Sequence, residues 1–349
     1  LDWLRTDIAY PMADGSTALY FNRLDYVIFD LFLLQRPDAI ADYSKEEIAR
    51  ANERFGAMDK EQRTKLFSNM MLGLPGSDDA FTPEQVLTEL KKYEGITVAK
   101  LKEHLFYFLQ QVVPVAEECG LSMAIHPDDP PYSVLGLPRI MSTEQDAADL
   151  LAAVPSPANG LCFCTGSFGA RKDNNVPAML KRFGDHIHFL HLRNTKRDAE
   201  GNFYEADHLA GDTEMYDVIK EVILLQRRRN ISLPMRPDHG HQMLDDLKKK
   251  IRHTYDIHQL LQVPEIKGFF GPKLTSFSIM VAANITGYIF RVKKPLRPPQ
   301  DRDLTAINLL RGELPCPSKI RACPASTILP QLTISTLRSS SIWVSPARP

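Results

Sequence analysis

The most constraining feature of the sequence is an alternation of two hydrophobic patterns between residues 98 and 238. Short, nearly continuous apolar runs at 121–125, 160–164, 186–190 and 231–235 alternate with amphipathic segments at 98–119, 143–154, 175–183 and 212–229. Continuous apolar runs are typical of parallel strands that are covered on both faces, and amphipathic helices supply such cover. Four repeats of this kind predict βα units and an α/β fold.

The segments on either side of this alternation follow other patterns. Residues 16–110 are charged and helix-rich, and Ser44 with Glu47 forms a capping box that predicts a helix start. Residues 251–349 hold 13 Lys and Arg against 5 Asp and Glu, and 11 of the 25 prolines. We therefore expect a domain at 1–250 with a helical insertion at 16–110. A basic, Pro-rich, poorly structured tail is expected at 251–349, with one helix or strand near 274–290.

Composition narrows the class of protein. The net charge is -1 over 349 residues, so charge points neither to nucleic acid nor to a membrane surface. The five cysteines form no Cys-x-x-Cys pair and no secretory signal opens the chain, which favours a reducing, cytoplasmic location. The longest apolar run, about 279–290, is too short to span a bilayer.

Four side chains with metal-binding atoms stand where the predicted strands end: His126, Cys164, His191 and Asp238. The carboxyl ends of parallel barrel strands converge on one mouth, where barrel enzymes place their active sites. Two imidazoles, a thiolate and a carboxylate can bind a divalent ion, and the thiolate by itself favours Zn(II). Each residue also has a structural alternative, such as a loop histidine, an inert buried thiol or a capped turn. Because all four stand in register, a metal site is favoured, whereas Cys162 on the same strand as Cys164 is predicted to pack in the core.

Six motifs carry a family resemblance. They are His126-Pro-Asp-Asp-Pro-Pro131, Gly136-Leu-Pro-Arg139, Cys164-Thr-Gly-Ser167, His191-Leu-Arg193, His208-Leu-Ala-Gly-Asp212 and the run from Met235 to Lys248. In this order they resemble the mannonate dehydratases, a family of the xylose-isomerase-like (β/α)8 TIM barrels. The resemblance covers residues 1 to about 250. It implies an incomplete (β/α)8 TIM barrel, about its C-terminal half, without the first half of the barrel and with an unrelated tail.

The resemblance also implies an activity and a metal. The family removes water from D-mannonate to give 2-keto-3-deoxy-D-gluconate, in hexuronate catabolism, with Mn(II) or Fe(II) as cofactor. The metal ligands implied for this chain are His126, Cys164, His191 and Asp238. The expected partner is a small sugar acid, and a homodimer is compatible with the resemblance.

Further residues receive roles from the same resemblance. His239 is the implied acid/base, and Tyr255 is a second catalytic candidate, although Ile251-Arg-His-Thr-Tyr255 departs from the Asn-Pro-Gly-Tyr-Ser pattern of the family. Arg193 and Arg236 are expected to hold the substrate carboxylate or to orient neighbours. His208 and Asp212 are expected to contact sugar hydroxyls, with a helix N-terminus as the structural alternative.

Two other functions stay open. An inactive fragment or pseudoenzyme of the same family would keep the metal ligands without a complete pocket. A metal-dependent sugar isomerase would keep the barrel and the metal, and it would call for a second, carboxylate-rich metal site that the sequence does not display.

Overall fold

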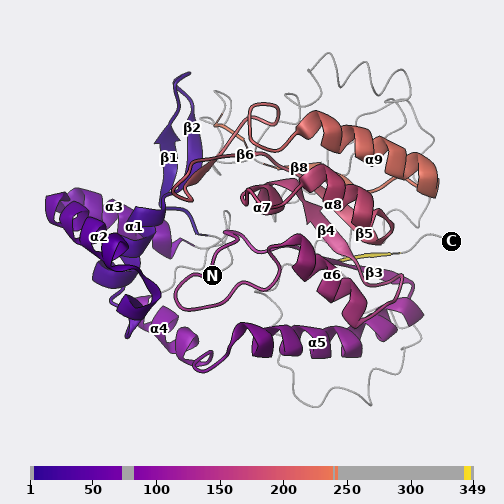
Figure 1. The fold of residues 1–349 in the computed structure, drawn as a ribbon, viewed down its shortest axis with the longest axis horizontal. Helices are drawn as coiled ribbons and strands as arrows, with labels where there is room; N and C mark the ends of the chain where they lie inside the picture. The colour runs from indigo at the N-terminus through magenta and orange to yellow at the C-terminus, as the bar shows by residue number, and fades with distance from the viewer. Residues whose placement is uncertain (1–3, 73–81, 239, 243–341, 347–349) are drawn as a thin grey trace, which may run out of the picture.

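Two sheets organise the chain in its computed structural model, which describes residues 4–72, 82–238, 240–242 and 342–346. The larger sheet has the strand order β8-β5-β4-β3-β9 and the smaller one the order β1-β2-β7-β6 (Figure 1). The strands of the larger sheet are β3 (Leu121–Ile125), β4 (Leu161–Cys164), β5 (Ile187–Leu192), β8 (Met235–Pro237) and β9 (Ile342–Pro346). β3, β4, β5 and β8 run parallel to one another, and β9 pairs antiparallel with β3. The predicted α/β fold with parallel βα units is confirmed.

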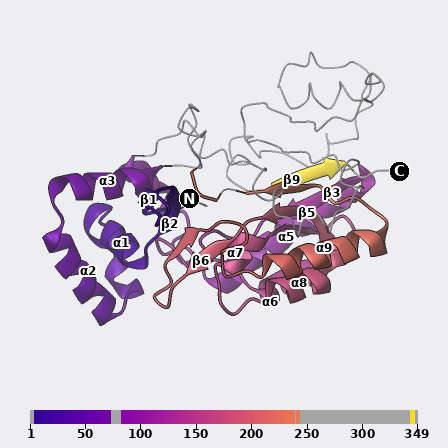
Figure 2. The ribbon, with the colours of Figure 1, turned by 90° about the horizontal axis from the view of Figure 1, so that it is seen from above.

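Helices cover this parallel sheet along one side (Figure 2). They are α5 (Val98–Glu118), α6 (Glu144–Ala153), α8 (Val176–Phe183) and α9 (Met215–Arg229). Their apolar stripes pack with the strands into one core, in which Leu109, Leu150, Leu180 and Val222 are almost fully buried. Thr143 caps α6 and Asn175 caps α8 through side-chain oxygens, which satisfies N–H groups that a helix start leaves unpaired.

A helical layer precedes this core in the chain, and it packs with a small antiparallel sheet whose strands come partly from before β3 and partly from after β5. The sheet consists of β1 (Asp7–Pro11), β2 (Thr17–Phe21), β6 (Thr195–Arg197) and β7 (Phe203–Glu205). The helices are α1 (Arg23–Ile28), α2 (Lys45–Ala57), α3 (Lys60–Met71) and α4 (Pro83–Lys91), with a π-helical turn at Phe29–Leu33 and a 3-10 turn at Ala39–Asp42. Phe21 and Phe203, stacked at 5.3 Å, join this layer to the sheet. The predicted capping box of Ser44 and Glu47 is present at the start of α2.

The tip of the β1–β2 hairpin reaches the segment that follows β8. The Gln242 backbone N–H donates to the Thr17 carbonyl at 2.7 Å, and the Thr17 hydroxyl donates to the Gln242 side chain at 3.0 Å. Ser16 Oγ lies 3.2 Å from His241 Nδ1. Residues 225 positions apart in the sequence therefore meet beside the end of the last parallel strand.

Some predicted boundaries differ from the structure. The helical segment 16–110 begins with strand β2 and ends inside α5, whose apolar face belongs to the core of the parallel sheet. The strand predicted at 231–235 starts only at Met235, because Pro234 has no N–H and contributes just its carbonyl, which accepts from the Leu190 N–H. Apart from β9, the predicted tail at 251–349 lies outside the described residues. Within those residues, no helix is both long and apolar enough to cross a membrane.

Candidate metal centre

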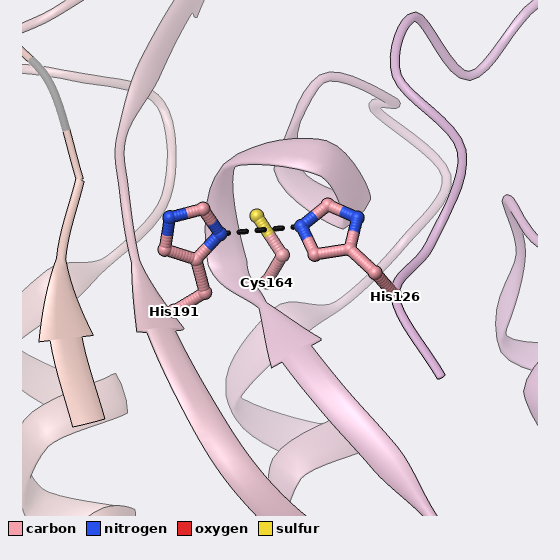
Figure 3. A group of neighbouring side chains, drawn as sticks. All are labelled: His126, Cys164 and His191. Atoms are coloured by element: carbon pink, nitrogen blue, oxygen red, sulfur yellow. Dashed lines mark hydrogen bonds between the residues drawn. The ribbon is translucent and has the colours of Figure 1, made fainter. Parts of the chain in front are cut away.

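Three predicted ligands meet at the carboxyl ends of adjacent parallel strands (Figure 3). His126 directly follows β3, Cys164 ends β4, and His191 lies opposite Cys164 on β5. One ligand atom from each residue lies within 4.8 Å of the other two, and His126 Nε2 is 3.2 Å from His191 Nδ1. Parallel register thus converts three distant sequence positions into one cluster, which we call the His–Cys–His trio.

The ring of His126 is oriented by its own loop. His126 Nδ1 lies 2.6 Å from the Pro127 carbonyl oxygen. A carbonyl can only accept, so Nδ1 carries the hydrogen and the lone pair of Nε2 faces the centre. This is the arrangement by which metal-binding histidines usually fix their tautomer.

Asp238 lies at the Nε2 side of the His191 ring, opposite the Nδ1 atom that faces His126. Its Oδ2 atom is 3.0 Å from His191 Nε2, and its Oδ1 atom accepts from Arg236 Nη2 at 2.7 Å. The Asp238 N–H donates to the Leu192 carbonyl at 2.7 Å, and the residue is buried. In this geometry Asp238 forms a carboxylate–histidine pair that points His191 Nδ1 at the centre.

Charge in the trio is set by opposing effects. Burial raises the pKa of the Cys164 thiol, but the adjacent His191 and His126 rings lower it more, so its pKa lies well below the usual value. Burial lowers the pKa of His191, but Asp238 and the Cys164 sulfur raise it to about 9. These opposing effects favour the thiolate form of Cys164 and the protonated form of the His191 ring.

The donor set fits a divalent transition-metal ion. Bonds of roughly 2.0–2.3 Å to nitrogen and sulfur place tetrahedral ligands roughly 3.3–3.8 Å apart, close to the 3.2 Å between the two ring nitrogens. The lowered pKa of the Cys164 thiol favours the deprotonated sulfur that metal binding requires. The trio could hold such an ion once His191 loses one proton.

Metal affinity should therefore depend on pH. Below the His191 pKa of about 9, binding must displace the Nδ1 proton, so affinity should fall as pH decreases. We expect a loss approaching tenfold per pH unit between about pH 8.5 and pH 6.5. Titrations with Mn(II) followed by electron paramagnetic resonance would measure it, and an affinity that stays constant over this range would contradict the protonation state inferred here.

The predicted substrate-binding residues occupy unequal environments. Arg193 is only 1% exposed, and its guanidinium donates to Glu205, Asp129 and Ser167. These contacts favour an orienting role for Arg193 over direct binding of a substrate carboxylate. Arg236 keeps a partly exposed side chain and donates to Asp238.

His208 and Asp212 differ as well. His208 is buried, and its Nε2 donates to the Leu192 carbonyl at 3.1 Å, while Nδ1 has no hydrogen-bond partner in the described part of the chain. Burial lowers the His208 pKa, so Nδ1 is a free acceptor. Asp212 is paired with Lys196 and Arg197 of β6. It does not cap α9, whose N-cap residue is Glu214, so the structural alternative for Asp212 is wrong.

Two catalytic candidates, His239 and Tyr255, lie outside the described residues. Four residues with a structural role at the centre escaped prediction: Arg5, Asp129, Ser167 and Glu205. Asp129 and Ser167 lie within two of the six family motifs, and this position in the sequence could have indicated them. No signal in the sequence indicates Arg5 or Glu205. Arg5 pairs with Asp129, 124 residues away, and Glu205 pairs with Arg193, 12 residues away.

Fold and site together define a mixed α/β protein with a candidate metal centre at the carboxyl ends of its parallel strands. The sequence profile described as D-mannonate dehydratase (UxuA) matches residues 1–275. The chain belongs to this family. The matched range includes Tyr255.

Individual relatives agree with the family match. A mannonate dehydratase of Saccharophagus degradans is 46% identical over 253 residues, which cover 71% of this chain and 64% of the relative. One from a Marinomonas species is 45% identical over 275 residues, covering 77% and 70%. The crystal structure of mannonate dehydratase from Streptococcus suis serotype 2 superposes with a TM-score of 0.51 at 28% identity, over 77% of this chain and 62% of that one. The chain thus spans about two thirds of the length of these proteins.

Proposed function

We propose that this chain is a metal-dependent mannonate dehydratase, a hydro-lyase that converts D-mannonate to 2-keto-3-deoxy-D-gluconate and water. The observation that carries the proposal is the His–Cys–His trio, with its buried sulfur and two partly buried imidazoles, at the strand ends of a chain of this family. The substrate is then a small sugar acid of hexuronate catabolism, and the enzyme acts in the cytoplasm as a homodimer, without nucleic-acid or membrane partners.

The proposed cofactor is Mn(II) or Fe(II), held by His126, Cys164 and His191, with Asp238 as the fourth residue of the metal site. When bound, the ion supplies positive charge next to the substrate carboxylate and C2 hydroxyl, which makes the C2 proton more acidic. Asp238 also contacts His191 Nε2, and this contact supports the orientation of the His191 ring.

The reaction needs one proton removed from C2 and one proton added to the departing C3 hydroxyl. His239, next to Asp238, is proposed as the acid/base, and Tyr255 as a second proton-transfer group. Arg236 lies beside Asp238 with a partly exposed side chain, so it is our candidate for contact with the substrate. His208 offers a buried acceptor to a sugar hydroxyl through Nδ1, and Asp212 is proposed near the same hydroxyls.

For the architecture, we infer that the parallel sheet corresponds to about the C-terminal half of a (β/α)8 TIM barrel. The family-like domain is proposed at 1–250, with the helical insertion at 16–110 and a tail at 251–349. Support for the half barrel comes from four parallel strands in sequential order and from the superposition on a solved mannonate dehydratase.

The purified chain, loaded with Mn(II), should form 2-keto-3-deoxy-D-gluconate from D-mannonate, and a chelator should abolish the product. Absence of product from folded, Mn(II)-loaded protein would contradict the proposal. That outcome would favour the inactive-fragment alternative, which the 64% coverage of a relative makes worth testing. A sugar isomerase is less favoured, because the described residues contain one group with metal-ligand spacing and no second, carboxylate-rich one.

A further inference from the structure

Four charged side chains form a buried network beside the trio. Arg5 donates to both oxygens of Asp129, at 3.3 and 2.9 Å, and to Glu205 at 3.0 Å. Arg193 donates to Glu205 at 2.6 and 2.8 Å and to Asp129 at 2.7 Å. No member is more than 8% exposed. Two guanidinium groups thus face two carboxylates, and this balance allows the charges to be buried.

Arg193 also contacts the segment that follows Cys164, through hydrogen bonds and packing. The Arg193 N–H donates to the Thr165 hydroxyl at 2.8 Å, and that hydroxyl donates to the Arg193 carbonyl at 2.6 Å. A Cβ added to Gly166 would lie 2.3 Å from Arg193 Cγ, so the backbone of α7 (Thr165–Gly169) rests directly on the arginine stem. Arg193 Nη1 donates to Ser167 Oγ at 3.2 Å. Arg193 therefore contacts three consecutive residues after the ligand.

Ser167 connects this arginine to the metal-binding sulfur. Its hydroxyl donates to Cys164 Sγ at 3.3 Å, and its backbone N–H donates to the same sulfur at 3.4 Å. A guanidinium group only donates, so the contact with Arg193 makes Ser167 Oγ the acceptor and leaves the hydroxyl hydrogen for the sulfur. The direction of donation runs from Arg193 through Ser167 to Cys164.

We infer that Ser167 and Arg193 are positioning residues that hold the Cys164 thiolate in its metal-binding orientation and reduce its electron density by hydrogen bonding. The inference rests on the metal site of the proposed function. Outer hydrogen-bond partners fix the direction of a ligand's lone pairs and tune the metal. The Asp129 and Glu205 carboxylates keep Arg193 in place, so the relay is anchored by the buried network.

Ser167→Ala in the full chain tests the relay, because it removes the hydroxyl donor and leaves the backbone donor. We expect Mn(II) affinity to fall by about tenfold, the lower end of the 10–100-fold range for outer partners. In the Co(II)-loaded protein the sulfur-to-metal charge-transfer band should move to longer wavelength, because a thiolate with one hydrogen bond fewer gives up an electron more readily. Arg193→Lys keeps the charge but loses the planar fork, and should move both readouts in the same direction.

Ser142→Ala is the matched control. Ser142 is also buried, but its hydroxyl donates to Asp128 at 3.3 Å, away from the sulfur. Equal Mn(II) affinity and an unshifted Co(II) band in Ser167→Ala would overturn the inference, as would the same changes in Ser142→Ala. If the parental chain binds neither Mn(II) nor Co(II), the proposed metal site fails and the inference with it. If the parental chain binds both and Ser167→Ala behaves identically, only the inference fails.

Discussion

Cys164→Ser should remove specific Mn(II) binding and, with it, the proposed dehydratase activity. The thiolate is the anionic member of the trio, and a serine hydroxyl stays protonated near neutral pH and offers no equivalent charge. Loss of a direct ligand should exceed the roughly 10–100-fold effect of an outer partner, so we expect more than a 100-fold loss of affinity. Isothermal titration with Mn(II) and a product assay with D-mannonate would measure both effects.

Cys162→Ser provides the matched control for this experiment. Cys162 is a buried thiol two residues earlier on β4, and burial holds its pKa well above the usual value, so it is a neutral core side chain. Its replacement should lower the free energy of unfolding by about 1–3 kcal/mol, because it buries a more polar hydroxyl in place of the thiol, and should leave Mn(II) affinity intact. Equal loss of metal binding in both variants would refute the assignment of Cys164.

Glu205→Gln should be among the most destabilising isosteric changes in the protein. It leaves Arg5 and Arg193 with one carboxylate between them in a place without water access. Breaking a buried ion pair from one side costs about 3–5 kcal/mol, because a charge stays buried without its partner. Urea unfolding monitored by circular dichroism would measure the change.

Glu200→Gln is the corresponding surface control. Glu200 pairs with Arg50, and both side chains are more than half exposed. Solvent screens such pairs, so the urea midpoint should barely change. A similar midpoint for both variants would mean that the buried network contributes no more than a surface contact.

The sequence predicts the parallel units well because each strand and helix has its own hydrophobic period. It also predicts that His126, Cys164 and His191 converge, because strand polarity alone brings their positions to one edge. The contact that Asp238 makes with His191 could not be predicted from the sequence in this way. The place of Asp238 at the end of β8 is local information, but the face of His191 that it approaches depends on the orientation of two side chains.

The buried network shows a second limit. Arg5 and Asp129 are separated by 124 residues, and no pattern in either segment indicates that they pair. For Arg193 the family resemblance left two roles open, holding the substrate carboxylate or orienting neighbours, and the fold places it between two carboxylates. The choice between these roles depends on tertiary packing, which hydrophobic periodicity does not encode.

The contact of the β1–β2 hairpin with His241 and Gln242 has a consequence for the order of folding. The trio needs only residues 126 to 191, which neighbouring βα units bring together through short crossovers. The hairpin contact instead closes a loop of 225 residues and carries a larger entropic cost. We therefore expect the metal-binding side of the mouth to form before the contact between the hairpin and the segment after β8 is made.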